Sequence, residues 1–395
     1  MRKELDVYNA FFGDCIILKD LDDDTNVLVD FGIHYHSFVS YPYTDRDTLT
    51  KNIAEDIANR YSNRNLSLLI THFHEDHVSG LIHMYQSKNP AYKGLFKNIY
   101  IANIWDNPFA VSITLLEQMI LEHELRKSGL PRTTASLFDI LAFLTISTKK
   151  NITLLNRGVV FEDGKYVALW PLKSMHIKTF KELDLGLPPE LERELEELAR
   201  ITCIFVMRVL VGNEGYEESY TGELSIELLD ASYNRLLDDY SEFLSNNNWT
   251  NEKKAKLNKL NHEYNVVFQN LEDCDENVLF TGDAEIPQMN SIAKRKDIPL
   301  YSDYKYIKIP HHGTDAHYFD FTSYNPQTVI ITNGRVIKVK YPDSYKISDQ
   351  YGSLAATHVC ANSNWCENCT FNCATSKSVC AINRVLVYSS LYKTV

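Results

Sequence analysis

Residues 66–80, LSLLITHFHEDHVSG, constrain the fold of this chain more than any other stretch. Residues 66–71 form an apolar run with the length and continuity of a strand that is buried on both faces. The polar residues that follow would then lie at the carboxyl end of that strand, where open α/β sheets place their sites. This stretch therefore predicts an α/β fold with a functional site directly after a buried strand.

Four side chains that commonly bind metals follow this strand within six residues: His72, His74, Asp76 and His77. The spacing is too dense for a helical zinc site with ligands at i and i+4, so it predicts a tight loop folded around metal. Imidazole and carboxylate together suit Zn²⁺, with Mn²⁺ or Fe as alternatives where oxygen ligands predominate. A histidine-rich polar loop without metal is the other interpretation.

The pattern HxHxDH at 72–77 resembles the signature of the metallo-β-lactamase superfamily of dinuclear metallohydrolases. Two later stretches, in the same order as in that superfamily, strengthen the resemblance. FTGDAE at 280–285 is similar to its LxxGD motif, and HHGT at 311–314 resembles the HHGS motif of ComEC-like metallo-β-lactamase domains. The resemblance implies a four-layer αβ/βα sandwich with two metal ions, Zn²⁺ or Mn²⁺, at the edge shared by its two sheets.

The resemblance also implies a set of ligands: His72 and His74 for one metal, Asp76, His77 and His312 for the second, and Asp283 between the two. Asp76 and Asp283 would thereby take part in catalysis, with a metal-bridging hydroxide as the nucleophile. His311 would act as a proton donor or phosphate contact. An exchange of roles between His311 and His312 remains an open alternative.

The third histidine of the first metal has no clear match in this sequence. The superfamily keeps it near the segment that corresponds to ALWPLKSMH, where His176 is the candidate and water or substrate is the alternative ligand. Asp14 and Asp30 resemble superfamily residues that support the ligands, and Asp30 would orient a metal-binding histidine. An ordinary acid at a strand end is the alternative for Asp30. Thr314 keeps a hydroxyl where the ComEC-like motif has Ser.

The other segments are expected to build sheets and helices around these motifs. The sequence predicts one strand at 5–18 and one at 26–31, joined as a hairpin by an acidic turn, strand pairs at 151–171 and 264–283, and single strands at 98–103, 201–211 and 327–334. Helical insertions are expected at about 110–148 and 212–262. The 212–262 insertion could shape a substrate groove, contact a protein partner or decorate the fold. We expect a hydrolase domain over residues 1–356, followed by a Cys-rich segment, 357–395, that packs on the same domain.

Five of the eight cysteines crowd into this C-terminal segment: Cys360, Cys366, Cys369, Cys373 and Cys380. The CxxC spacing within this cluster favours a structural zinc ion, with reversible disulfides and unligated thiols as alternatives. An intracellular setting favours zinc over disulfides. Cys15 and Cys203 lie in apolar runs, which predicts buried free thiols.

Composition limits the classes of partner. The net charge of −12, from 52 acidic and 40 basic residues, argues against broad electrostatic capture of nucleic acid. The N-terminus lacks the apolar core of a signal peptide, and no stretch approaches the length of a membrane span. We therefore expect a cytoplasmic protein without a membrane partner.

The ComEC-like match implies a phosphodiesterase or nuclease that acts on a nucleotide or nucleic acid. The alternatives are a small-molecule ester, thioester or lactone hydrolase and a catalytically silent metal-binding partner protein, since a fold does not select the bond. If the protein is a nuclease, we expect a basic groove that runs alongside the metal site and is built from residues such as Lys305, Lys308, Arg335, Lys338 and Lys340. A small-molecule hydrolase predicts a closed apolar pocket with a helical insertion as its lid.

Overall fold

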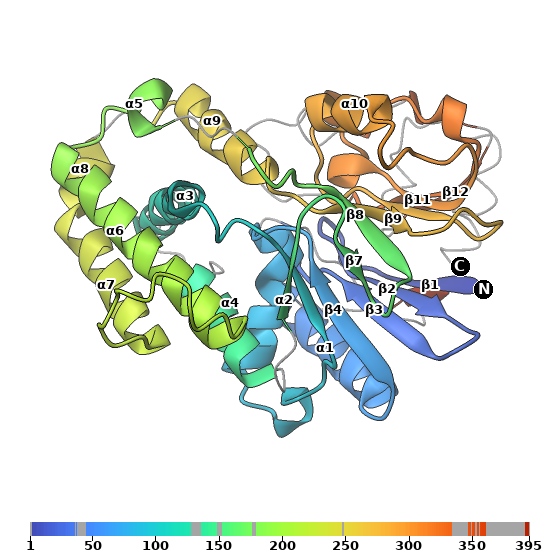
Figure 1. The fold of residues 1–395 in the computed structure, drawn as a ribbon, viewed down its shortest axis with the longest axis horizontal. Helices are drawn as coiled ribbons and strands as arrows, with labels where there is room; N and C mark the ends of the chain where they lie inside the picture. The colour runs from blue at the N-terminus through green and yellow to red at the C-terminus, as the bar shows by residue number, and fades with distance from the viewer. Residues whose placement is uncertain are drawn as a thin grey trace.

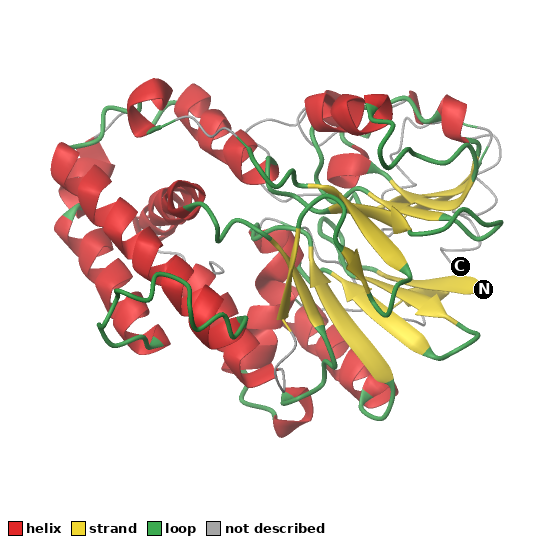
Figure 2. Ribbon diagram, viewed as in Figure 1, coloured by secondary structure: helices red, strands yellow, loops and turns green. Residues whose placement is uncertain are grey.

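The computed structural model describes residues 2–35, 37, 45–127, 136–147, 152–175, 179–246, 249–333, 347–348, 350–351, 354, 356–360 and 392–394. Its strands form two mixed sheets of seven strands each. Figures 1 and 2 show these sheets together on one side of the molecule and a group of helices projecting from the other. The α/β class predicted from the sequence is confirmed.

The order across the first sheet is β14 (Tyr392–Thr394), β1 (Lys3–Tyr8), β2 (Ile16–Asp20), β3 (Thr25–Val29), β4 (Asn65–Ile70), β5 (Ile99–Ala102) and β6 (Ile152–Leu155). Neighbours from β14 to β3 pair antiparallel, whereas those from β3 to β6 pair parallel. The sequence prediction of one strand over 5–18 is wrong. The chain turns between β1 and β2 around Gly13, whose φ of +152° suits a glycine.

The order across the second sheet is β13 (Thr357–Cys360), β12 (Pro326–Ile331), β11 (Tyr304–Lys308), β10 (Val278–Phe280), β9 (Val267–Asn270), β8 (Tyr166–Trp170) and β7 (Val160–Phe161). Here β13 to β10 pair parallel and β10 to β7 pair antiparallel. The segment beyond residue 356 thus supplies an edge strand to each sheet.

Three apolar clusters separate the layers of the molecule. One lies between the sheets and joins residues such as Val27 and Leu69 of the first to Phe268 and Phe280 of the second. Another packs the outer face of the first sheet against α1 (Arg46–Tyr61) and α2 (Glu75–Gln86). The third packs the second sheet against α10 (Ile286–Lys294). The layers therefore run helix, sheet, sheet, helix.

The projecting helical group joins two stretches of the chain. Its members are α3 (Pro108–Lys127), α4 (Leu137–Ser147), α5 (Phe180–Leu183), α6 (Pro189–Phe205), α7 (Ile226–Asp239), α8 (Ser241–Asn246) and α9 (Asn251–His262). Within it, α3 packs against both α6 and α9, and α6 packs against α7. Figure 1 shows α3 between α6 and α9.

The buried strand predicted at 201–211 is wrong. These residues end α6 and continue as a π-helical turn, Val206–Leu210. The segment reads as continuously apolar because other helices cover it on several sides, and Cys203, Ile204 and Val206 are fully buried. The helical insertion is consequently larger than the predicted 212–262 and begins before α6.

Within the described part of the chain, no helix combines the length and the apolar character that crossing a bilayer requires.

Candidate metal centre

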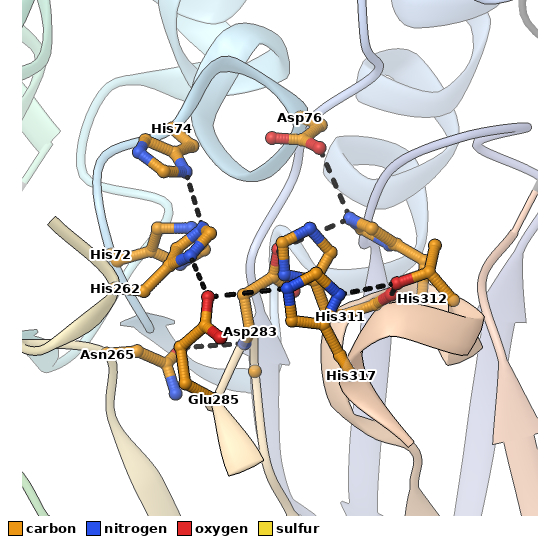
Figure 3. Close-up of polar contacts among 12 residues, drawn as sticks. His72, His74, Asp76, His262, Asn265, Asp283, Glu285, His311, His312 and His317 are labelled. Carbon is orange, nitrogen blue, oxygen red and sulfur yellow. Dashed lines mark hydrogen bonds and ion pairs between the residues drawn. The ribbon is translucent and has the colours of Figure 1, made fainter. Parts of the chain in front are cut away.

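The predicted ligands come from segments that follow strands of both sheets, at the ends of those strands. His72 and His74 follow β4, Asp283 follows β10, and His311 and His312 follow β11. Because β3 and β4 are parallel, as are β10 and β11, these carboxyl ends meet where the two sheets adjoin. Figure 3 shows the side chains directed toward one another across this edge.

The HxHxDH motif is part loop and part helix, so the prediction of a tight loop throughout is wrong. His74 is the N-cap of α2, and Asp76 and His77 lie in its first turn. An acid in the first turn of a helix is favoured by the partial positive charge of the helix N-terminus. The turn thereby places Asp76 and His77 beside the two histidines of the preceding loop.

The first group of ligand atoms belongs to His72, His74 and His262, and these atoms lie within 4.8 Å of one another. His262 ends α9, and its Nε2 lies 3.1 Å from Nδ1 of His74 (Figure 3). The sequence reasoning missed His262, which is placed by the helical insertion more than 180 residues after the first motif. Its signal in the sequence was weak: a single histidine shortly before an apolar strand.

Each histidine of the first group has an outer partner. Nδ1 of His262 lies 2.9 Å from Glu285, and Nε2 of His74 lies 3.5 Å from Glu117. Nδ1 of His72 lies 3.1 Å from the hydroxyl of Thr71, which donates its hydrogen to Asp30. That hydroxyl must therefore accept from Nδ1–H, which leaves the Nε2 lone pair of His72 directed inward.

The second group comprises Asp14, His77, Asp283 and His312, whose ligand atoms also lie within 4.8 Å of one another. Nε2 of His77 lies 3.3 Å from Asp283 Oδ1, and Nε2 of His312 lies 3.6 Å from Asp283 Oδ2. Asp76 borders this group, with its Oδ2 3.2 Å from Nε2 of His312. Asp283 thus belongs to the second group, whereas the sequence resemblance implied a position between the two metals.

Outer partners hold the second group as well. Asp30 Oδ2 lies 2.8 Å from Nδ1 of His77, the orienting contact that the sequence resemblance implied. Nδ1 of His312 lies 3.0 Å from the Thr332 hydroxyl and 3.3 Å from Asp14 Oδ1. Such outer contacts fix ring orientation and increase the basicity of a nitrogen that binds metal.

Lys308 lies behind this group rather than in a groove. Its side chain is 1% exposed, and Nζ lies 2.6 Å from Asp14 and 3.6 Å from Asp283. The expectation that Lys308 lines a basic groove is therefore wrong. Lys305 pairs with Glu276 at 2.6 Å and donates to the Lys3 carbonyl oxygen. The other three residues of the expected groove, Arg335, Lys338 and Lys340, lie outside the described residues.

Several inward atoms are buried without a hydrogen-bond partner: Nε2 of His72, Nε2 of His77 and Oδ1 of Asp283. Burial lowers the pKa of His72 well below its usual range, so this ring is neutral. Burial would also lower the pKa of His312, but Asp283 and Asp14 raise it to about 9. Neutral nitrogens and carboxylate oxygens that face one another at these distances repel unless a proton or cation lies between them. This arrangement could hold a metal ion.

His311 lies beside the second group and faces the first. Its backbone adopts a φ of +46°, and its Nδ1 lies 3.7 Å from Asp283 Oδ2 without a hydrogen-bond partner. The ring stacks on His317 with centroids 3.7 Å apart, and His317 Nε2 lies 3.4 Å from Glu285. Thr314 donates to the His311 carbonyl oxygen, which supports the turn. Sequence reasoning missed His317 and Glu285.

A cavity of about 280 Å³ lies beside the first group. His72, His74, Asp283 and His311 line one end of it, and helices α3 and α9 supply a wall. His34 also contributes to the lining. Among the described residues that line the cavity, five carry carboxylates and one, Lys254, carries an ammonium group that pairs with Glu124.

Some predicted site residues cannot be placed. His176 lies outside the described residues, as do Cys366, Cys369, Cys373 and Cys380. Cys360 ends β13, but its side chain is not described. Cys15 and Cys203 are buried free thiols, as predicted.

The chain matches no protein-family model, and the search of curated proteins finds no relative.

Proposed function

We propose that this chain is a metal-dependent hydrolase of the metallo-β-lactamase type, with two divalent cations in the two ligand groups. His72, His74 and His262 would hold one cation, and His77, His312 and the bordering Asp76 the other, with Asp283 between them and Asp14 held by Lys308. The observation that carries the proposal is the inward convergence of buried, unpartnered nitrogen and oxygen atoms from both groups. The helix, sheet, sheet, helix layering supports the fold assignment.

The donor set fits divalent metal ions. The first group offers three imidazoles, which suit Zn²⁺, and the second combines imidazoles with carboxylates, which also suit Mn²⁺. The carboxylates of Asp14, Asp76 and Asp283 are buried with Lys308 as the cation that contacts two of them. Bound cations would replace the proton that the raised pKa of His312 places among these carboxylates.

Bound metals would supply Lewis acidity and a water that ionises near neutral pH. The chain supplies orientation and proton transfer. Asp30, Glu117 and Glu285 hold the histidine rings by their outer nitrogens. His311 lines the cavity beside Asp283 as a neutral ring, since burial lowers its pKa well below the usual range, so it is placed to accept a proton or to contact the leaving group. The stacked ring of His317 restricts how His311 can turn.

The cavity favours a small substrate over nucleic acid. Its volume suits a small molecule, and Lys305 and Lys308, the described lysines of the expected basic groove, are held in ion pairs. We therefore propose hydrolysis of a small ester, thioester or lactone, in place of the nuclease expected from the ComEC-like motif. A small phosphodiester is the second candidate, since a pair of cations around Asp283 could stabilise both the attacking and the leaving oxygen of a phosphoryl transfer.

The test compares metal content and turnover for the wild type, Asp283→Ala and, as a control, the exposed Asp275→Ala. Substrates are p-nitrophenyl esters and bis-p-nitrophenyl phosphate. We expect about two metal ions in the wild type and in Asp275→Ala, and loss of both metal and turnover in Asp283→Ala. Retention of full metal content and activity in Asp283→Ala would refute the proposed centre. Turnover of the p-nitrophenyl esters would indicate acyl transfer, and turnover of bis-p-nitrophenyl phosphate would indicate phosphoryl transfer.

A further inference from the structure

A third group of ligand atoms lies beside the two groups of the proposed centre. It comprises His262, Glu285 and His311, with one ligand atom of each within 4.8 Å of the others. His262 belongs to this group and to the first, because its two nitrogens face different residues. Its Nε2 lies 3.1 Å from Nδ1 of His74, and its Nδ1 lies 2.9 Å from Oε1 of Glu285. The third group is therefore reached from the other nitrogen of the His262 ring.

His317 adds a second free-standing imidazole to this group. Its Nε2 lies 3.4 Å from Oε1 of Glu285, the same oxygen that faces His262. Its ring stacks on His311 with centroids 3.7 Å apart. Figure 3 shows Glu285 in contact with both His262 and His317. Glu285, His311 and His317 thus lie close to one another on one side of His262.

The Thr314 hydroxyl determines which nitrogen of His317 carries the proton. This hydroxyl donates its hydrogen to the His311 carbonyl oxygen and lies 2.8 Å from Nδ1 of His317. It must therefore accept from Nδ1–H, which leaves the Nε2 lone pair of His317 directed at Glu285. A nitrogen lone pair and a carboxylate oxygen 3.4 Å apart repel each other unless a proton or a cation lies between them.

The other members of this group also have the charge and the unpaired atoms of metal ligands. Burial alone would raise the pKa of Glu285, but its contacts with His262 and His317 lower it, so the carboxylate is ionised. Among the described residues, Glu285 forms its ion pairs with these two histidines and with no lysine or arginine. Burial lowers the pKa of His311 well below its usual range, so its ring is neutral, and its Nδ1 is buried without a hydrogen-bond partner.

We propose that Glu285, His311 and His317 form a third divalent-cation site, separate from the two sites of the proposed centre. One carboxylate and two imidazoles suit Zn²⁺, and they also suit Mn²⁺ or Fe²⁺. The inference rests on the proposed centre for the role of His262. If His262 binds the first cation through Nε2, its Nδ1 keeps a proton and donates to Glu285, which links the two sites.

The third site should bind its cation more weakly than the other two. The rings of His311 and His317 are parallel to within 5°, so their nitrogens do not point at one position. One ring must turn when the cation binds, and this movement costs free energy. His311 cannot bind this cation and accept a proton through the same nitrogen. The site is therefore an alternative use of His311 at high cation concentration.

The test counts bound Zn²⁺ by equilibrium dialysis of chelator-stripped protein over a range of free Zn²⁺ concentrations. His317→Phe keeps an aromatic ring to stack on His311 but has no ligand nitrogen. It should bind about one ion fewer than the wild type at high free Zn²⁺ and the same number at low free Zn²⁺. Any zinc held by the C-terminal cysteines cancels in this difference. His123→Phe is the matched control, since His123 is also partly exposed but contacts Ser245.

His317→Ala repeats the measurement without a ring, and circular dichroism checks that each variant is folded. If both His317 variants bind as many ions as the wild type at every concentration, the site is overturned, and a proton between His317 and Glu285 accounts for their contact. Loss of a tightly bound ion in these variants also overturns it, because His317 would then belong to the proposed centre. Asp283→Ala tests that centre separately, so failure of the third site leaves the proposed function standing.

Discussion

Glu117 Oε2 lies 3.5 Å from Nε2 of His74, and this contact joins the helical insertion to the HxHxDH motif. Burial alone would raise the pKa of Glu117, but His74 lowers it, so the carboxylate is ionised beside the ring. Since Nδ1 of His74 faces His262, the contact leaves the inner nitrogen available as a ligand. The insertion therefore helps to build the proposed metal centre as well as the cavity.

Replacing Glu117 should weaken metal binding at the first group. Glu117→Gln keeps the shape of the side chain but removes the charge that polarises His74, and loss of such a partner typically lowers metal affinity about 10- to 100-fold. Titration against a coloured chelator measures this affinity. Glu124→Gln, two turns along the same helix, is the control and should bind metal like the wild type. Equal affinities in the two variants would show that Glu117 does not support His74.

His262, rather than His176, should be the third imidazole of the first site. His262→Ala should lose about one equivalent of metal, because it removes one of three neutral nitrogen ligands. His176→Ala should retain the wild-type content. Metal analysis of both purified proteins decides between them, and the reverse result would restore the assignment expected from the sequence motif.

The local motifs identified His77, Asp283 and His312, but Asp14, which the resemblance placed among the supporting residues, is the fourth member of the second group. His77, Asp283 and His312 each follow an apolar strand, and the parallel pairing of those strands brings the residues together. A short motif at a strand end thus carries information about its tertiary position. Asp30 was also identified correctly, because a carboxylate at the end of β3 reaches the ring of His77.

The residues missed by sequence reasoning share a different property. Glu117 and His262 lie in helices α3 and α9, and their positions depend on how the insertion packs against the sheets. The prediction of a strand at 201–211 was wrong for a related reason. Apolar continuity indicates burial but does not distinguish a strand from a helix surrounded by other helices. Local sequence patterns therefore predicted the strands, and the proposed site residues that follow them, better than the helical residues that complete the proposed site.

Metal binding should release protons and depend on pH. In the metal-free protein, burial opposes but Asp283 and Asp14 raise the pKa of His312 to about 9. A metal ion must displace that proton, so apparent affinity should rise up to about tenfold per pH unit until the pH reaches the pKa. Calorimetry in two buffers with different ionisation enthalpies counts the released protons. Metal binding without proton release near neutral pH would contradict this account.

The metal motif should require a glycine at position 32, because the backbone of Asp76 and His77 passes close to it. A Cβ at this position would lie 2.3 Å from the carbonyl carbon of Asp76 and from the backbone nitrogen of His77. Gly32→Ala should push the first turn of α2 away from Asp283, with reduced metal content as the readout. Gly215→Ala is the control, because its Cβ would meet no atom closer than 3.9 Å. Unchanged metal content in Gly32→Ala would mean that the loop adjusts without moving the ligands.

The two lysines of β11 should contribute unequally to stability. Lys308 is buried between Asp14 and Asp283, so Lys308→Met leaves buried carboxylates without their cation and should destabilise the fold by about 3–5 kcal/mol. Lys305 lies three residues earlier, and its side chain and that of its partner Glu276 are both partly exposed. Lys305→Met should therefore cost about 1 kcal/mol or less. Urea unfolding of both variants in the presence of a chelator measures the difference without a contribution from metal. If Lys308→Met is as stable as Lys305→Met, the Asp14–Lys308 pair does not stabilise the loop that carries Asp14, and that loop must be held by its backbone bonds to Asp76 and Gly32 instead.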